Sequence, residues 1–140
     1  MRHPYPIVVR FGDCDPAGIA YFPVIFDWFH QAMEDWFDRG LERPYATVIE
    51  GRRLGFPAVH SEADFVAPCR MGDRLTVGLS VAKVGRTSLH LAYTLEGAEA
   101  EDRRATGRTV VVVTDLETLR PRPLPEDLAE RMAPYRSQPS

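Results

Sequence analysis

The chain has 140 residues, of which 44% are hydrophobic and 26% charged, with a formal net charge of −3 at pH 7. This length is typical of one domain with its own hydrophobic core, so we expect residues 1–140 to form a single domain. The slight negative charge argues against nucleic acid or an anionic membrane surface as the main partner. No apolar run approaches the roughly 20 residues of a membrane-spanning helix, and no hydrophobic leader opens the chain.

Neither the cysteines nor the histidines form a recognisable ligand or disulfide pattern. Cys14 and Cys69 lack C-x-x-C spacing, so we expect two free thiols in a reducing, cytoplasmic compartment. The four histidines have no metal-ligand spacing, and we predict no metal site.

The N-terminal third predicts a strand at residues 5–12, an acidic turn, and a long helix. Pro23 suits the first turn of a helix, whose N–H groups are unpaired in any case, and Gly40 is a plausible end. Apolar side chains cover about half of the helix circumference: Ile25, Phe26, Trp28, Phe29, Ala32, Met33, Trp36 and Phe37. A stripe this wide predicts a helix that other elements wrap.

The rest of the chain predicts four more strands. After a short helical turn near 45–50, period-2 alternation marks strands at 57–67, 73–84 and 86–96, and an apolar run marks a fourth at 105–115. The turns between them are short, which favours antiparallel neighbours. The predicted class is therefore α+β, a five-stranded antiparallel sheet wrapped around one long central helix. In the tail, about 121–140, we expect a short helix at 126–132 and a frayed end.

The two faces of the predicted sheet suggest that copies of the chain associate with one another. One sheet around one helix buries one face only, and we expect the other face to carry Leu, Val and Tyr side chains from several strands. Such a face needs a partner, which predicts at least a dimer.

Asp13 and Asp15 are the first candidates for chemistry. Asp commonly bonds its own backbone and Asp-Pro often opens a turn, so a plain turn explains them by themselves. Against this, they lie between a hydrophobic strand and a helix N-terminus, which stabilises anions and polarised carbonyls. A carboxylate beside such donors is suited to acyl transfer. Cys14 has no basic neighbour to activate its thiol, so we expect a bystander.

Further candidates lie along the chain. His30 is at the border of the apolar helix stripe and His60 alternates outward from a strand, so either could line a cleft. Arg86, Thr87 and Ser88 follow Gly85 at a predicted hairpin, where they form either a solvated turn or an anion clamp. Asp-x-Asp also occurs in aspartyl-phosphate enzymes, but these need Lys and Asp at the ends of parallel strands, and Lys83 is the one lysine here.

Three motifs together carry a family resemblance. Residues 11–23 read Phe-Gly-Asp-Cys-Asp-Pro-Ala-Gly-Ile-Ala-Tyr-Phe-Pro. This stretch resembles the signature of the 4-hydroxybenzoyl-CoA thioesterases and related small acyl-CoA thioesterases. Two later motifs of that family are matched by Pro68-Cys-Arg-Met-Gly-Asp73 and by Gly85-Arg-Thr-Ser88. The similarity extends over about residues 6–118 and implies the hot-dog fold, with the long helix enclosed by the sheet.

The resemblance also implies roles for individual residues. Asp15 matches the family's catalytic carboxylate, either as the nucleophile or as the base that activates water, and Asp13 is its supporting neighbour. The backbone N–H groups near Tyr21 and Phe22 would hold the thioester carbonyl. Further implied contacts are His30 beside the acyl ring, and Arg86, Thr87 and Ser88 on the CoA phosphates. His60 is kept as a supporting candidate from its strand position alone.

The implied activity is hydrolysis of an acyl-CoA to the free acid and CoA, without metal or cofactor. Many family members carry His where this chain has Phe22, a difference that favours an aromatic, 4-hydroxybenzoyl-like acyl group. The family's cleft lies between subunits, so we expect a homodimer and a homotetramer built from two dimers. Two other functions remain open: a hot-dog hydratase or dehydratase acting on acyl thioesters, and a non-catalytic acyl-CoA-binding protein.

Overall fold

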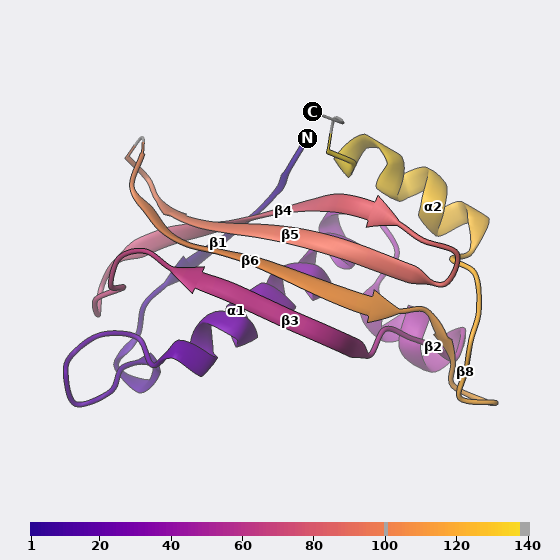
Figure 1. Ribbon diagram of the computed structural model, residues 1–140, viewed down its shortest axis with the longest axis horizontal. Helices are drawn as coiled ribbons and strands as arrows, with labels where there is room; N and C mark the ends of the chain where they lie inside the picture. Colours follow the sequence, from indigo (N-terminus) through magenta and orange to yellow (C-terminus); the bar gives the residue numbers. More distant parts are fainter. Residues whose placement is uncertain (100, 138–140) are drawn as a thin grey trace.

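The main sheet has five antiparallel strands, as predicted (Figure 1). The computed structural model describes residues 1–99 and 101–137. The strands lie in the spatial order β1-β4-β5-β6-β3. Their bounds are β1 His3–Val8, β3 Ala58–Phe65, β4 Arg74–Val84, β5 Ser88–Gly97 and β6 Arg103–Val112.

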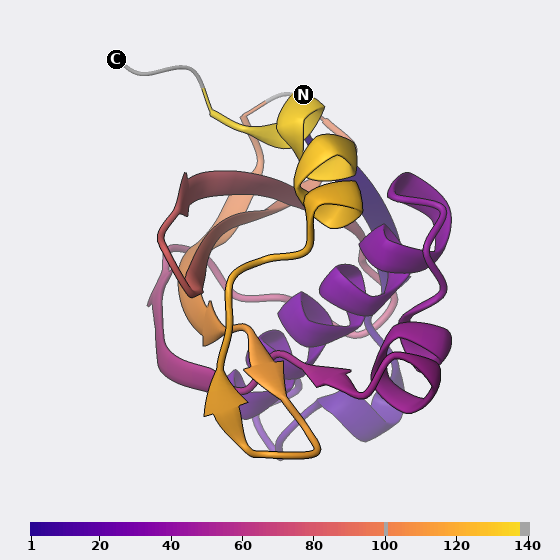
Figure 2. The ribbon, with the colours of Figure 1, turned by 90° about the vertical axis from the view of Figure 1, so that its right-hand side faces the viewer.

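The long helix α1 (Phe22–Asp35) continues into the wider turn η2 (Trp36–Gly40), and the sheet curves around it (Figure 2). The predicted end at Gly40 and the early Pro23 are both confirmed. Most of the predicted apolar stripe is buried, at no more than 6% exposure: Ile25, Trp28, Phe29, Ala32, Met33, Trp36 and Phe37. This burial explains why the stripe covers half of the helix: the curved sheet contacts the helix over a wide arc.

The outer face of the sheet corrects one expectation. Side chains alternate across a strand, so the large apolar residues of β5, and those of β4 as far as Val81, fall on one face, towards α1. Each of these is at most 3% exposed: Leu75, Val77, Leu79, Val81, Leu89, Leu91, Tyr93 and Leu95. Val84 follows a β-bulge and is half-buried against the same core. The alternate positions are small or polar, such as Thr76, Gly78, Ser80, Ala92 and Thr94. The outer face of β4 and β5 is therefore not apolar, contrary to the prediction, and these two strands give no reason for a dimer.

The two edges of the sheet differ in character. Edge strand β1 contains Pro4 and Pro6, which lack a backbone donor and discourage further pairing. Edge strand β3 has no proline and exposes apolar side chains, with Val59 at 63% and Phe65 at 48%. The adjoining Val66 is 63% exposed. The free edge of β3 is thus the one suited to pairing.

Smaller elements close the ends of the sheet. The predicted strand at 5–12 stops at Val8, and a 3₁₀ turn, η1 (Phe11–Asp13), follows. The predicted strand at 105–115 is split, because β6 ends at Val112 and β7 (Thr114–Asp115) pairs instead with β2 (Leu54–Gly55) and β8 (Arg120–Pro121). The predicted turn near 45–50 is η3 (Thr47–Gly51).

The C-terminal helix α2 (Glu126–Met132) has the predicted bounds, and the turn η4 (Ala133–Tyr135) follows it. Its Leu128 and Met132 are buried, and Asp127 bonds to Arg43 and Arg52. The frayed end was expected at residues 137–140. Ser137 instead donates its N–H to the carbonyl of Val81 at 2.9 Å, and residues 138–140 lie outside the described part of the chain. Among the described residues, no helix combines the length and apolar character needed to cross a membrane.

Candidate active site

Residues 13–21, here called the acid loop, are held by a short ladder of backbone hydrogen bonds. The N–H of Tyr21 donates to the carbonyl of Asp13 at 2.8 Å, and the N–H of Asp15 to that of Ile19 at 2.9 Å. The N–H of Ala20 donates to the carbonyl of Cys69 at 2.8 Å, so a third segment flanks the loop. The loop is therefore a small, braced hairpin at the start of α1.

Asp15 takes part in a turn and still has a free oxygen. Its Oδ1 accepts the N–H of Ala17 at 2.8 Å, and its carbonyl accepts the N–H of Gly18 at 2.9 Å. Gly18 has φ of 82°, a conformation that favours glycine. Within the described residues no partner is recorded for Asp15 Oδ2. The turn and the catalytic interpretations are thus compatible, because the turn fixes the carboxylate and leaves one oxygen available.

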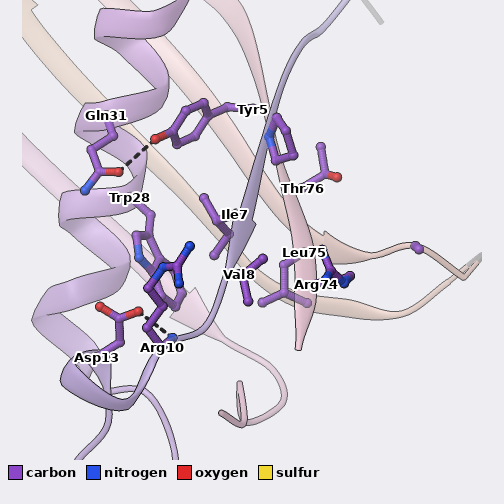
Figure 3. Close-up of a pocket in the computed structure, with 12 residues that line it drawn as sticks. Tyr5, Ile7, Val8, Arg10, Asp13, Trp28, Gln31, Arg74, Leu75 and Thr76 are labelled. Atoms are coloured by element: carbon purple, nitrogen blue, oxygen red, sulfur yellow. Dashed lines mark hydrogen bonds between the residues drawn. The ribbon is translucent and has the colours of Figure 1, made fainter. Parts of the chain in front are cut away.

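Asp13 points to a different side of the loop from the groove described below. Its Oδ2 accepts the N–H of Arg10 at 2.9 Å, which closes the 3₁₀ turn. Figure 3 shows Asp13 at the rim of a hollow of about 620 Å³ beside β1, near Arg10 and Trp28. Tyr5 donates to Gln31 at 2.9 Å in the same hollow. Asp13 therefore shapes the loop through both its side chain and its carbonyl.

The helix start offers one backbone donor where two were expected. The N–H of Tyr21 is already bonded to Asp13, and Pro23 has no N–H. The N–H of Phe22 has no acceptor recorded within residues 1–99 and 101–137. Phe22 is therefore the position from which α1 can donate to a ligand, with the partial positive charge of the helix N-terminus behind it.

An apolar groove of about 350 Å³ adjoins this donor. One wall is formed by Ile19, Ala20, Phe22 and Ile25, and the other by residues 65–69. The rings of Phe22 and Phe65 meet edge to face at 6.2 Å between centroids. We call this the acid-loop groove; its second wall was not predicted as part of the site, although the Pro68–Asp73 motif pointed to that segment.

The cysteines fit the expectation of free thiols. Cys69 is 2% exposed at the base of the groove, and burial raises the pKa of its thiol. Cys14 makes a long contact of 3.6 Å from Sγ to the carbonyl of Arg10. A buried thiol with a raised pKa is a poor nucleophile.

A second cavity, of about 280 Å³, lies further along α1, between the helix and strands β3 and β6. Aromatic rings form much of its wall, and Phe29 and Tyr93 stack there at 4.6 Å with 8° between their planes. Its polar groups are His30, Ser61, Tyr93 and Thr109. We call it the aromatic cavity. His30 keeps one edge towards solvent, with Nε2 at 3.0 Å from Glu34.

His60 lies elsewhere. On β3 it is paired with Val110, which is in turn paired with the outward-facing His90, so the three form a row on the outer face of the sheet. Its Nε2 is 3.6 Å from Glu62. Within one chain His60 lines neither the acid-loop groove nor the aromatic cavity.

The predicted anion clamp is at the opposite end of the sheet from Asp15. Strand β4 begins beside the acid loop and ends at the hairpin that carries Arg86, Thr87 and Ser88 (Figure 1). Its 11 residues span about 35 Å at roughly 3.3 Å per residue. Arg86 is exposed, and Ser88 Oγ lies 3.5 Å from His90 Nε2. One chain thus keeps its carboxylate and its clamp far apart.

The backbone of the C-terminal segment passes close to the hairpin. The N–H of Val113 donates to the carbonyl of Thr87 at 2.8 Å, and the N–H of Arg122 donates to that of Val113 at 2.8 Å. This neighbour of the hairpin was not predicted, because it depends on how β7 and β8 fold back. Among the described residues, no three His, Cys, Asp or Glu side chains cluster as metal ligands would.

Comparison with known proteins identifies the class. Residues 9–132 match the family model of the thioesterase-like superfamily, and the chain belongs to that superfamily. It is a thioester hydrolase with the hot-dog fold, as the three sequence motifs had implied.

Individual relatives are more specific. The chain is 33% identical to a 4-hydroxybenzoyl-CoA thioesterase of Pseudomonas sp. over 87% of this chain and 91% of that protein. It is 32% identical to a 1,4-dihydroxy-2-naphthoyl-CoA hydrolase of Synechococcus elongatus, covering 88% and 89%. A match to a hydrolase of that name from Prochlorococcus marinus spans 63% of the relative's length. The solved 1,4-dihydroxy-2-naphthoyl-CoA thioesterase of Synechocystis superposes with a TM-score of 0.86 at 27% identity, covering 95% and 96%.

Proposed function

We propose that this chain hydrolyses an aromatic acyl-CoA to the free acid and CoA, with Asp15 as the reacting carboxylate. One observation carries the proposal: a single backbone ladder holds both a carboxylate with a free oxygen and the helix-terminal N–H of Phe22. An anion and an oxyanion donor at one helix start are the two groups that acyl transfer requires.

The chemistry follows from these two groups. The thioester carbonyl oxygen accepts the N–H of Phe22, which stabilises the negative charge that develops on it. Asp15 Oδ2 then either attacks the carbonyl carbon or removes a proton from the water that attacks it. The C–S bond breaks, and CoA leaves as its thiol after protonation. Where Asp15 has attacked, water then hydrolyses the acyl–Asp15 anhydride, which releases the acid and restores the carboxylate. Rapid-quench trapping of an acyl-enzyme on Asp15 distinguishes attack by the carboxylate from its action as a base.

The aromatic cavity supports an aryl substrate. Its walls offer stacked rings, and His30, Ser61 and Thr109 offer polar contacts to a ring hydroxyl. The relatives named above are called thioesterases or hydrolases of hydroxylated aromatic acyl-CoA esters. We therefore place 4-hydroxybenzoyl-CoA and 1,4-dihydroxy-2-naphthoyl-CoA among the substrates to be tested first.

A second copy of the chain supplies the CoA clamp in this proposal. The span of β4 exceeds the reach of one CoA ester, so Arg86 and Asp15 of one chain do not share a substrate. Strand β3 runs from the hairpin end of the sheet, at Ala58, to the acid-loop end, at Phe65. If two β3 edges pair antiparallel about a two-fold axis, the hairpin of each chain comes to the acid-loop end of the other.

The prolines of β1 leave the β3 edge as the place for this pairing, and its exposed Val59 and Phe65 become covered. We propose a homodimer of this kind, and a homotetramer of two such dimers. Light scattering tests the assembly. A stable and fully active monomer contradicts it.

A substrate panel tests the proposed reaction. Release of CoA thiol is followed with benzoyl-, 4-hydroxybenzoyl- and 1,4-dihydroxy-2-naphthoyl-CoA beside acetyl- and hexanoyl-CoA. The expected result is a kcat/KM at least tenfold higher for the aryl esters, and loss of turnover in Asp15→Asn. Tight binding of the esters without turnover indicates a binding protein, and hydration of an enoyl-CoA without thiol release indicates a hydratase. Either result contradicts the proposed function.

A further inference from the structure

Arg104, near the start of β6, is a nearly buried cation with three different acceptors. Its side chain is 15% exposed. Nη1 donates to the carbonyl of Pro68 at 2.9 Å and to Asp73 Oδ2 at 2.7 Å. Nε donates to Asp102 Oδ1 at 2.8 Å, and Nη2 to Asp102 Oδ2 at 3.0 Å. This guanidinium therefore joins β6 to the segment that precedes β4.

The backbone of Arg104 holds the same segment. Its carbonyl accepts the N–H of Val66 at 2.8 Å and of Ala67 at 3.2 Å. Residues 66–73, here called the bracing segment, are thus fixed to β6 from both the main chain and the side chain of one residue. Asp73 also closes the segment on itself, because its Oδ2 accepts the N–H of Arg70 at 2.9 Å.

The bracing segment in turn supports the acid loop. The carbonyl of Cys69 accepts the N–H of Ala20, and Ile19 pairs with Arg70. Ile19 accepts the N–H of Asp15. Residues 66–69 also form part of the second wall of the acid-loop groove. Backbone hydrogen bonds, together with the peptide bonds between them, therefore connect Arg104 through the bracing segment to the N–H of Asp15.

We propose that Arg104 is a positioning residue, which sets the geometry between Asp15 and the N–H of Phe22 by fixing the bracing segment. The proposal rests on the function proposed above. A displacement of about 1 Å at reacting groups can lower a rate by roughly 100-fold, so a residue outside the groove can affect the chemical step.

The residue type matters as well as its charge. A planar guanidinium satisfies the carbonyl of Pro68 and two carboxylates at once, whereas an ammonium is a point charge on a flexible stem. Arg104→Lys keeps the charge near Asp73 and Asp102 and loses the fixed fork. We expect it to fall between the wild type and Arg104→Met.

The test compares Arg104→Met and Arg104→Lys with Arg103→Met. Arg103 is the matched control, because it is the preceding residue, its side chain is 47% exposed, and the one ion pair it makes among the described residues is with Glu96. kcat and KM for the best aryl-CoA ester are measured well below the melting temperature of each variant. We expect kcat to fall tenfold to 100-fold in Arg104→Met with KM within threefold, to fall less in Arg104→Lys, and to be unchanged in Arg103→Met.

A purely structural role lowers the melting temperature and leaves kcat per folded molecule unchanged. A folded Arg104→Met with wild-type kcat therefore overturns the proposal, and so does a rise in KM alone. If Arg104→Met does not fold, Arg104→Lys and Asp73→Asn provide the same comparison. Asp15→Asn is measured in parallel. If Asp15→Asn keeps wild-type turnover, the proposed function itself is overturned. If Asp15→Asn loses turnover but the Arg104 variants keep wild-type kcat, only the positioning role of Arg104 is overturned.

Discussion

Gly107 lies directly against the ring of Phe29, a residue that lines the aromatic cavity, and the contact leaves no space for a methyl group. A Cβ at position 107 would lie 2.4 Å from Phe29 Cε2 and 3.1 Å from Cδ2 and Cζ. Phe29 is 2% exposed and stacks on Tyr93, the residue paired with Gly107 across the sheet. The ring has no solvent to move into, so Gly107→Ala must displace the stack.

Overpacking of this kind costs about 1–3 kcal/mol of unfolding free energy. With an unfolding entropy of about 2.1 cal/mol/K per residue, each kcal/mol lowers the melting temperature of a chain this long by about 3.5 °C. We therefore expect a decrease of about 3–10 °C. Because Phe29 and Tyr93 form walls of the proposed acyl site, KM for the dihydroxynaphthoyl ester should rise more than KM for acetyl-CoA.

Differential scanning calorimetry and the thiol-release assay measure the two effects. Gly51→Ala is the matched control, since its added Cβ meets Thr47 Cγ2 at an ordinary 3.5 Å. A melting temperature of Gly107→Ala within 1 °C of the wild type refutes the packing argument. An equal change of KM for the aryl and acetyl esters refutes the assignment of the cavity.

Three further predictions concern the donor, the clamp and the carboxylates. Phe22→Pro removes the backbone N–H at a position where the first turn of a helix tolerates proline, so kcat should fall about 100-fold to 1000-fold. Phe22→Ala keeps the N–H and should retain kcat within about tenfold of the wild type. Equal kcat values for the two variants exclude the Phe22 N–H as the donor. Arg86→Ala should raise KM for CoA esters about threefold to tenfold with little change in kcat, and Lys83→Ala is its exposed control on the same hairpin; an unchanged KM removes Arg86 from the clamp. The guanidinium of Arg104 lowers the pKa of Asp73, and that of Arg52 lowers the pKa of Asp127. Because these folded-state pKa values lie below the unfolded value of about 3.9, the two carboxylates stabilise the fold fully above about pH 5, and this stabilisation is lost as the pH falls through the folded values. Denaturant titrations in which stability already falls between pH 7 and pH 5 contradict this assignment.

The sequence pattern predicts the elements of this fold well, because helix and strand periodicities depend on which face is buried. The half-apolar stripe of α1 and the alternation in β4 and β5 both describe the same buried interior. The outer face was mistaken for apolar, although the same alternation places Thr76 and Thr94 there. The division of the last strand at Val113 was not predictable, since it depends on pairing with β2.

The site was predictable in its residue types and less so in its contacts. Asp15 and the helix start are adjacent in sequence, so local reasoning reached them. The carbonyl of Asp13 accepts the N–H of Tyr21, which leaves the N–H of Phe22 as the donor. This contact depends on how the acid loop closes and could not be read from the sequence. The role of Arg104 and the remoteness of Arg86 from Asp15 depend on the order of the strands, and no short-range pattern encodes that order.

The most direct test of the account is kcat for hydrolysis of 4-hydroxybenzoyl-CoA by Asp15→Asn beside Asp115→Asn. Asp115 makes the same kind of turn, with Oδ1 accepting the N–H of Glu117 at 2.8 Å, but it lies in β7. We expect kcat to fall at least 100-fold in Asp15→Asn and to be unchanged in Asp115→Asn. Wild-type kcat in a folded Asp15→Asn contradicts the central claim that the Asp15 carboxylate carries the reaction.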